Sequence, residues 1–218
     1  MLLKQLDNLN NTNKYGISKK WIYKDSNAFE MCGNYIQKIN FSIEDFNKEL
    51  NLEKKEAKDI IYMILLGNWI KDTFNLLFDL FKKSLIIPFK KSDLNVEKDY
   101  LEAIRSFVVA HPMKTTRHKK FNFDGSFICS DILIEDRYFF GFMNDKNIFN
   151  IDLNGLNEGK SKFDYLLKVY SKENKMRFFK YICCSLEDLT YCVSKYVDEL
   201  LNFARFLKTL KKKEFKNI

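Results

Sequence analysis

Hydrophobic residues recur with helical spacing along two long stretches of the chain. Over 52–83, apolar side chains fall three and four positions apart and form a wide stripe, which predicts a long helix. The stretch 186–210 has the cleanest period, and its seam consists of Leu186, Leu189, Val193, Tyr196, Leu200, Phe203, Leu207 and Leu210. A second stripe beside this seam favours a helix packed inside a bundle, with a dimer contact as the alternative.

Shorter segments predict three further helices. One is expected over 27–37 and another over 42–49, where Ser42 begins a weak variant of the capping box. A third is expected over 96–110 and must end near Pro112, because the residue before a proline disfavours the α conformation.

The hydrophobic period changes over 127–153, where short β-branched and aromatic runs are separated by turn residues. The runs FICSDILI, RYFFGFM and NIFNIDL predict a three-stranded antiparallel meander. Residues 154–160 predict a loop, and 161–185 fits a helix and a strand equally well. We therefore expect a mainly α fold, a helical bundle with a small β-meander insertion over about 127–153. The chain is expected to form a single domain over 1–218, with a loosely packed lead-in over 1–25.

The composition supports this expectation. The chain has 218 residues, of which 46% are hydrophobic and 30% charged, as is usual for a globular protein, and its 7 Gly and 2 Pro favour helices. No apolar stretch approaches the ~20 residues that a bilayer demands, and the N-terminus has no leader-like apolar region. The five cysteines follow no CxxC spacing, so neither a disulfide framework nor a zinc site is indicated. We expect a cytoplasmic protein with no metal, no cofactor and no membrane association.

The positive charge is informative only where it is local. Lys and Arg number 37 against 29 Asp and Glu, a formal charge of +8, but nearly all the cations are lysines, as an AT-rich coding sequence specifies by default. Phosphate binding needs several cations on one face. Basic residues concentrate over 81–120 and again over 205–216. The second cluster also has a purely structural interpretation, because cations are stabilising at the negative end of a helix dipole.

The stretch with both histidines is the strongest candidate for a functional site. It also holds two of the five arginines, Arg105 and Arg117. Arg105 is followed directly by Ser106, then by four apolar residues, and then by His111. A helix with this pattern can present an Arg and a His at its surface while its apolar residues anchor it in the core.

These three residues resemble the motif of the HEPN superfamily, in which an Arg, about four to six intervening residues and a His follow one another. In that family the Arg is usually followed by a polar residue, as Arg105 is here by Ser106. The resemblance covers about 50–210 as a helical arrangement, and its specific residues are Arg105, Ser106 and His111. HEPN ribonucleases are all-helical bundles.

The resemblance implies a metal-independent endoribonuclease, of the kind found as toxins or in phage defence, with an antitoxin as a possible partner. It implies that a ribose 2′-OH attacks the adjacent phosphate, that His111 transfers the proton and that Arg105 stabilises phosphoryl charge. Six helical residues turn through about 600°, so the two side chains do not share a face, which the family's composite site in a homodimer would explain. Ser106 would line that cleft. The RNA would be held by Lys114, Thr116, Arg117, His118, Lys119 and Lys120.

Other interpretations of the same stretch stay open. Arg105 could pair with Glu102 or Asp99 while His111 caps the helix. The chain could also be a non-catalytic helical protein that binds nucleic acid or serves as a scaffold, because aromatic residues beside cations can stack on exposed bases. A metal site formed by His111, His118 and Asp131 is a third possibility, although its spacing matches no established pattern.

Overall fold

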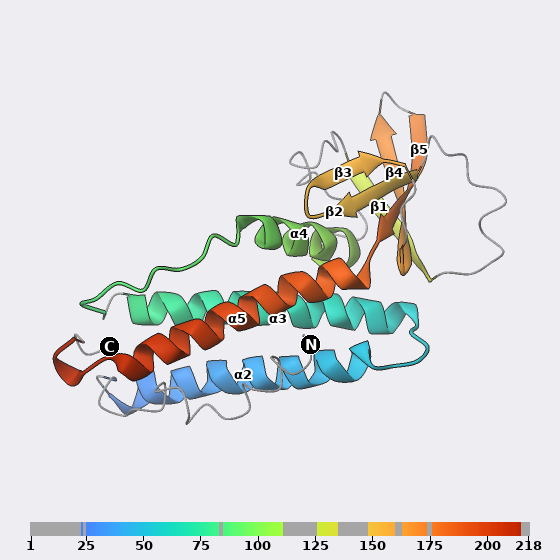
Figure 1. Cartoon of the computed structure of the whole chain (residues 1–218). Coiled ribbons are helices and arrows are strands. Elements are labelled where there is room, and N and C mark those ends of the chain that lie inside the picture. The colour runs from blue at the N-terminus through green and yellow to red at the C-terminus, as the bar shows by residue number, and fades with distance from the viewer. Residues whose placement is uncertain are drawn as a thin grey trace. The chain divides into compact units, whose positions relative to one another are not determined.

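The computed structural model describes residues 23, 25–82, 85–110, 126–134, 148–159, 163–173 and 176–214. Its elements follow in the order α2 (Ser26–Leu50), α3 (Ala57–Lys82), α4 (Asn95–Arg105), the π-helical turn η4 (Ser106–Ala110), β1 (Ser126–Ile134), β2 (Ile148–Asp152), β3 (Gly155–Glu158), β4 (Tyr165–Glu173), β5 (Met176–Cys184), α5 (Leu186–Thr209) and the 3-10 turn η8 (Lys212–Glu214) (Figure 1). The chain divides into two compact units. Unit 1 comprises Met1–Asn51, Leu66–Leu94 and Val193–Ile218, and unit 2 comprises Leu52–Leu65 and Asn95–Cys192. The single domain stays a prediction.

The expectation of a mainly α fold with a small meander is wrong, because the chain has an α+β fold. In the described residues, a five-stranded sheet in the order β1-β4-β5-β2-β3 accompanies the α-helices α2 to α5. The sheet is mixed, since β2 runs parallel to β5 whereas the other neighbouring pairs are antiparallel. The strands predicted from FICSDILI and NIFNIDL exist as β1 and β2, but β1 pairs with β4 rather than with a meander neighbour. The strand predicted from RYFFGFM lies outside the described residues.

The ambiguous segment 161–185 supplies the two central strands, β4 and β5. A central strand that is covered on both faces shows a nearly continuous apolar run, which cannot be told from a buried helix by period alone. In β4, Tyr165, Leu166 and Leu167 are all buried, as are the four residues 181–184 of β5. The loop predicted over 154–160 contains strand β3, which follows a two-residue turn after β2.

The long helices were predicted more closely. The stripes over 52–83 and 186–210 correspond to α3 and α5, and the segment 96–110 corresponds to α4 followed by η4. The two short helices expected over 27–37 and 42–49 are one continuous helix, α2, which Asp25 caps by accepting a hydrogen bond from the amide of Ala28 at 2.9 Å. Of the lead-in expected over 1–25, only Tyr23 and Asp25 are described.

Aromatic rings connect the helices of unit 1. Phe203 of α5 lies between the rings of Phe78 and Phe81 of α3, at centroid distances of 5.4 and 5.6 Å. Phe74 meets Tyr196 in the same edge-to-face manner at 6.0 Å. Such pairs stabilise by about 0.5–1.5 kcal/mol beyond the area they bury. These contacts account for the apolar stripes that the sequence shows on α3 and α5.

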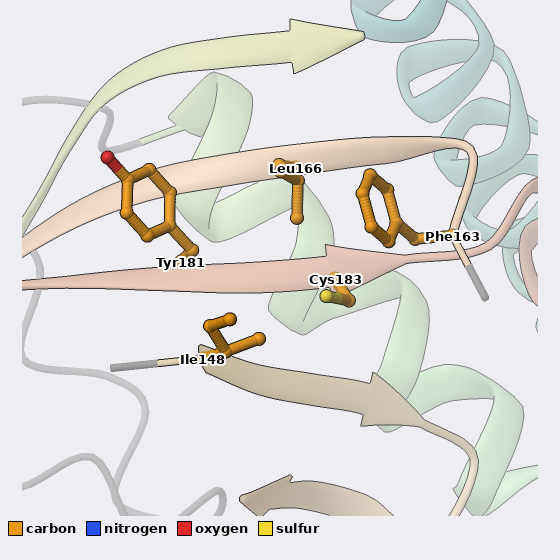
Figure 2. Packing of buried hydrophobic residues seen from close by; sticks show 5 residues of the cluster. All are labelled: Ile148, Phe163, Leu166, Tyr181 and Cys183. Atoms are coloured by element: carbon orange, nitrogen blue, oxygen red, sulfur yellow. The ribbon is translucent and has the colours of Figure 1, made fainter. Parts of the chain in front are cut away.

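In unit 2, one face of the sheet carries a compact apolar cluster. It consists of Ile148, Phe163, Leu166, Tyr181 and Cys183, all at most 7% exposed (Figure 2). The strand register places Leu166 opposite Cys183 and Ile148 opposite Tyr181, so these side chains share a face. Because successive residues of a strand point to opposite faces, Tyr165 and Cys184, which also lie opposite each other, belong to the other face.

Candidate functional site

The junction of α4 and η4 carries the described part of the predicted Arg–His motif. Arg105 is the last residue of α4 and is half-buried, and Ser106, the first residue of η4, is buried. Phe107 and Val108 follow within η4 and are also buried. Their burial anchors this turn in unit 2, where η4 contacts β1. Arg105 is therefore the candidate catalytic residue that the fold leaves partly accessible.

The helical geometry changes at the motif. The α-helical period of α4 ends at Arg105, and Ser106–Ala110 continue with π-helical geometry. A π turn is rare, because its i→i+5 hydrogen bonds fit the backbone less well, and it is found frequently at functional sites. Among the described helical segments, η4 alone has this geometry. It occupies the interval between Arg105 and His111.

The remaining predicted site residues lie outside the described part of the chain. They are His111, Lys114, Thr116, Arg117, His118, Lys119 and Lys120. The structure consequently places Arg105 and Ser106 together and leaves the other assignments as predictions. Within the described ranges, no three His, Cys, Asp or Glu side chains are grouped as metal ligands would be.

A buried group of polar side chains lies in unit 2, and the sequence analysis did not identify it. Tyr100 of α4 interacts electrostatically with Tyr165 of β4, Cys184 of β5, and Asp188 and Cys192 of α5. The Tyr100 hydroxyl is buried without a hydrogen-bond partner among the described residues, whereas Tyr165 has a side-chain hydrogen bond with Cys184. No local sequence pattern predicts this group, because β4, β5 and α4 bring its members together only when the sheet forms.

The electrostatics of this group disfavour nucleophilic chemistry. Burial raises the pKa of Tyr100 and Tyr165 well above the ordinary value, and burial likewise raises the pKa of the Cys192 thiol. The Cys184 thiol donates to the carbonyl oxygen of Ile182 at 3.6 Å. A thiol or phenol that keeps its proton is a poor nucleophile. Cys32, Cys183, Cys184 and Cys192 are free and buried, as small core residues are.

A cavity of about 220 Å³ lies beside α4 in unit 2. It is lined by Val96, Asp99, Tyr100, Asp152, Leu153, Asn154 and Gly155. Its acidic side chains are the carboxylates Asp99 and Asp152. The pKa of nearby Asp188 is raised, first by burial and then by the charges of Asp152 and Glu187. Negative charge repels phosphate, so this cavity does not suit an RNA backbone.

The chain was compared with known proteins at three levels. No family model, no curated protein and no solved structure matches it. In the described part of the chain, no helix has both the length and the apolar character needed to cross a membrane. The functional assignment therefore rests on the residues themselves.

Proposed function

We propose that the chain is a metal-independent endoribonuclease whose catalytic residues include Arg105 and His111. The observation that carries the proposal is the π-helical turn that begins directly after Arg105 and spans the interval to His111. The proposal rests on these residues and on their resemblance to the HEPN motif rather than on the HEPN fold, because a five-stranded sheet is not part of that all-helical fold.

The proposed reaction forms one P–O bond and breaks another. The ribose 2′-oxygen attacks the adjacent phosphorus, the bond from phosphorus to the 5′-oxygen breaks, and the products are a 2′,3′-cyclic phosphate and a 5′-hydroxyl. His111 takes or gives the transferred proton, because an imidazole titrates near neutral pH. Arg105 stabilises the charge that builds on the phosphoryl oxygens, because a guanidinium is a fixed cation with several hydrogen-bond donors. Ser106, which would line the cleft, is buried at the first position of η4.

The proposal includes a composite cleft formed by two protomers, so that Arg105 and His111 act without sharing a helix face. Its RNA-binding residues are Lys114, Thr116, Arg117, His118, Lys119 and Lys120. We propose action in the cytoplasm, which the free cysteines favour. In the cell the enzyme would act as a toxin or a phage-defence effector, with an antitoxin protein as a possible partner.

The test uses the purified chain, a synthetic RNA in EDTA, and the same sequence with 2′-O-methyl groups. We expect cleavage of the unmodified RNA only, with 2′,3′-cyclic phosphate ends, because the methyl group removes the nucleophile. Arg105→Ala and His111→Ala should each lower the rate by about 10²-fold or more. The control is Arg205→Ala, which makes the same substitution as Arg105→Ala at an exposed arginine on α5 and should leave the rate unchanged.

Two results would contradict the proposal. Cleavage of the 2′-O-methyl RNA would exclude attack by the 2′-oxygen, and full activity in both variants would exclude the assigned residues. Circular dichroism melting curves must match those of the wild type, so that a lost rate is not a lost fold. RNA binding without cleavage, unchanged by His111→Ala, would instead support a non-catalytic nucleic-acid-binding protein.

A further inference from the structure

Unit 1 exposes a short apolar run directly after α3. Ile86 and Ile87 are 50% and 43% exposed, Pro88 is also exposed, and Leu85 is half-buried. Apolar residues that are consecutive in the chain and open to solvent are unfavourable unless they serve a function. The run is not part of a helix or of the five-stranded sheet.

The two isoleucines cannot simply fold back into the core, because the chain is held on both sides of them. The amide of Ile86 donates to the carbonyl oxygen of Glu214 at 3.0 Å, and the amide of Leu85 donates to that of Phe81 at 3.2 Å. On the other side, the ring of Phe89 packs against Phe203 at 5.1 Å. The exposure of the isoleucines is therefore built into unit 1.

Lysines surround this run. Lys82 and Lys90 flank it in the chain, and the bond between Ile86 and Glu214 brings Lys211 and Lys213 to it from the C-terminal end of unit 1. All four lysines are exposed. We call Ile86, Ile87 and these four lysines the basic tip. The bond thus joins the two basic clusters of the sequence at one place.

Few carboxylates offset this charge. Glu214 uses its own carboxylate to accept a hydrogen bond from the backbone amide of Lys211 at 2.6 Å. The next carboxylates along the chain from Lys82 and Lys90 are Asp79 and Asp93, each three residues away. Along the two segments that the bond joins, the four lysines therefore outnumber the carboxylates within two residues of them.

We propose that the basic tip docks on the surface of an anionic lipid bilayer. Aliphatic side chains at the centre of a basic rim fit the boundary between headgroups and acyl chains, where lysines meet the phosphate and carboxylate groups of anionic lipids. A surface that binds single-stranded RNA would instead present aromatic rings on which bases stack, and the exposed apolar residues here are aliphatic. Such docking needs no membrane-spanning helix, and it replaces the expectation from the sequence that the chain does not associate with membranes. The proposal does not depend on RNA cleavage.

The test is co-sedimentation of the purified full chain with vesicles of phosphatidylcholine, with and without about 30% phosphatidylserine. We expect binding only to the anionic vesicles, and weaker binding at high salt. The double variant Ile86→Asn/Ile87→Asn should lower the partition coefficient at least about tenfold. Lys211→Gln and Lys213→Gln should each lower it about fivefold.

Matched controls separate docking from general surface effects. Leu76 of α3 is 53% exposed and lies outside the tip, so Leu76→Asn should leave vesicle binding unchanged, as should Lys98→Gln on α4. The proposal is overturned if the wild-type chain does not sediment with anionic vesicles, or if the isoleucine variant binds as well as the wild type. Binding of a labelled oligo(U) RNA to the lysines, without any vesicle binding, would identify the tip as a nucleic-acid surface instead.

Discussion

Ser92 occupies both oxygens of the buried Glu199 carboxylate. Its backbone amide donates to Oε1 and its hydroxyl donates to Oε2, both at 2.8 Å, although the two residues are 107 positions apart in the chain. Glu199 lies on α5 and is 4% exposed. The pair therefore ties the segment that follows α3 to α5 within unit 1.

We expect Glu199→Ala to lower the free energy of unfolding by about 2–4 kcal/mol, because it removes both hydrogen bonds with Ser92 and leaves a cavity at a buried position. Ser92→Ala removes only the hydroxyl bond and should cost about 1 kcal/mol. Urea denaturation measures both. Asp198→Ala, at the half-buried neighbour of Glu199, is the control and should change stability by no more than about 0.5 kcal/mol. If Glu199→Ala and Asp198→Ala lowered the free energy of unfolding equally, the contact with Ser92 would contribute nothing to stability.

Replacing the buried Tyr100 by phenylalanine should not weaken unit 2. The hydroxyl of Tyr100 lacks a hydrogen-bond partner among the described residues, so Tyr100→Phe removes an unsatisfied group and keeps the ring. We expect the free energy of unfolding to stay constant or to rise by up to about 1 kcal/mol, whereas Tyr165→Phe, which removes the hydrogen bond with Cys184, should lower it by about 1 kcal/mol. A loss of more than about 1 kcal/mol in Tyr100→Phe would show that a water molecule or a ligand satisfies the hydroxyl.

Stability should fall in alkaline solution, and Cys32 should account for a defined part of the loss. Burial raises the pKa of this thiol from 9.0 to about 11, an effect that the hydrogen bond with Tyr23 opposes. Between pH 9 and pH 11 the unfolded chain releases this proton and the folded chain keeps it, so folding becomes less favourable as pH rises. A shift of this size corresponds to about 2–3 kcal/mol at pH 11.

The measurement is urea denaturation of the wild type and of Cys32→Ala at several pH values between 7 and 11, with a reducing agent present. Below pH 8 the two curves should run parallel, because the thiol is protonated in both states. Above pH 9 the wild type should lose stability more steeply than the variant. Curves that stay parallel up to pH 11 would exclude Cys32 as a cause of the alkaline loss.

Two glycines should respond in opposite directions to the same substitution. Gly155 follows the turn between β2 and β3 with φ +117°, a conformation that L-residues rarely adopt, so Gly155→Ala should destabilise by about 1–2 kcal/mol. Gly33 lies inside α2, and no atom lies within 4 Å of a Cβ built there. Gly33→Ala should stabilise by about 0.5–1 kcal/mol, because alanine loses less entropy in a helix. Thermal melting of both variants measures these effects. A Gly155→Ala protein as stable as the wild type would show that an L-residue is not strained at this position.

Local patterns were sufficient for α3 and α5. Their apolar residues recur every three or four positions, and this spacing indicates which face of a helix will be buried whatever it packs against. The same reasoning failed at Ser42, which was expected to cap a separate helix. In the structure Ser42 is buried in the middle of α2, because the packing of Ile39, Ile43 and Phe46 continues the helix through it.

The sheet and the candidate site depended on tertiary structure. Strands β4 and β5 form because β1 and β2 provide hydrogen-bonding partners on either side, and neither partner can be identified from the apolar runs of 165–184 alone. The pairing then sets Tyr165 opposite Cys184. The sequence by itself thus determined the long helices and the Arg105–His111 motif, because both depend on spacing within one segment. The tertiary structure decided the α+β fold, the π turn after Arg105 and the basic tip, because these depend on contacts between segments far apart in the chain.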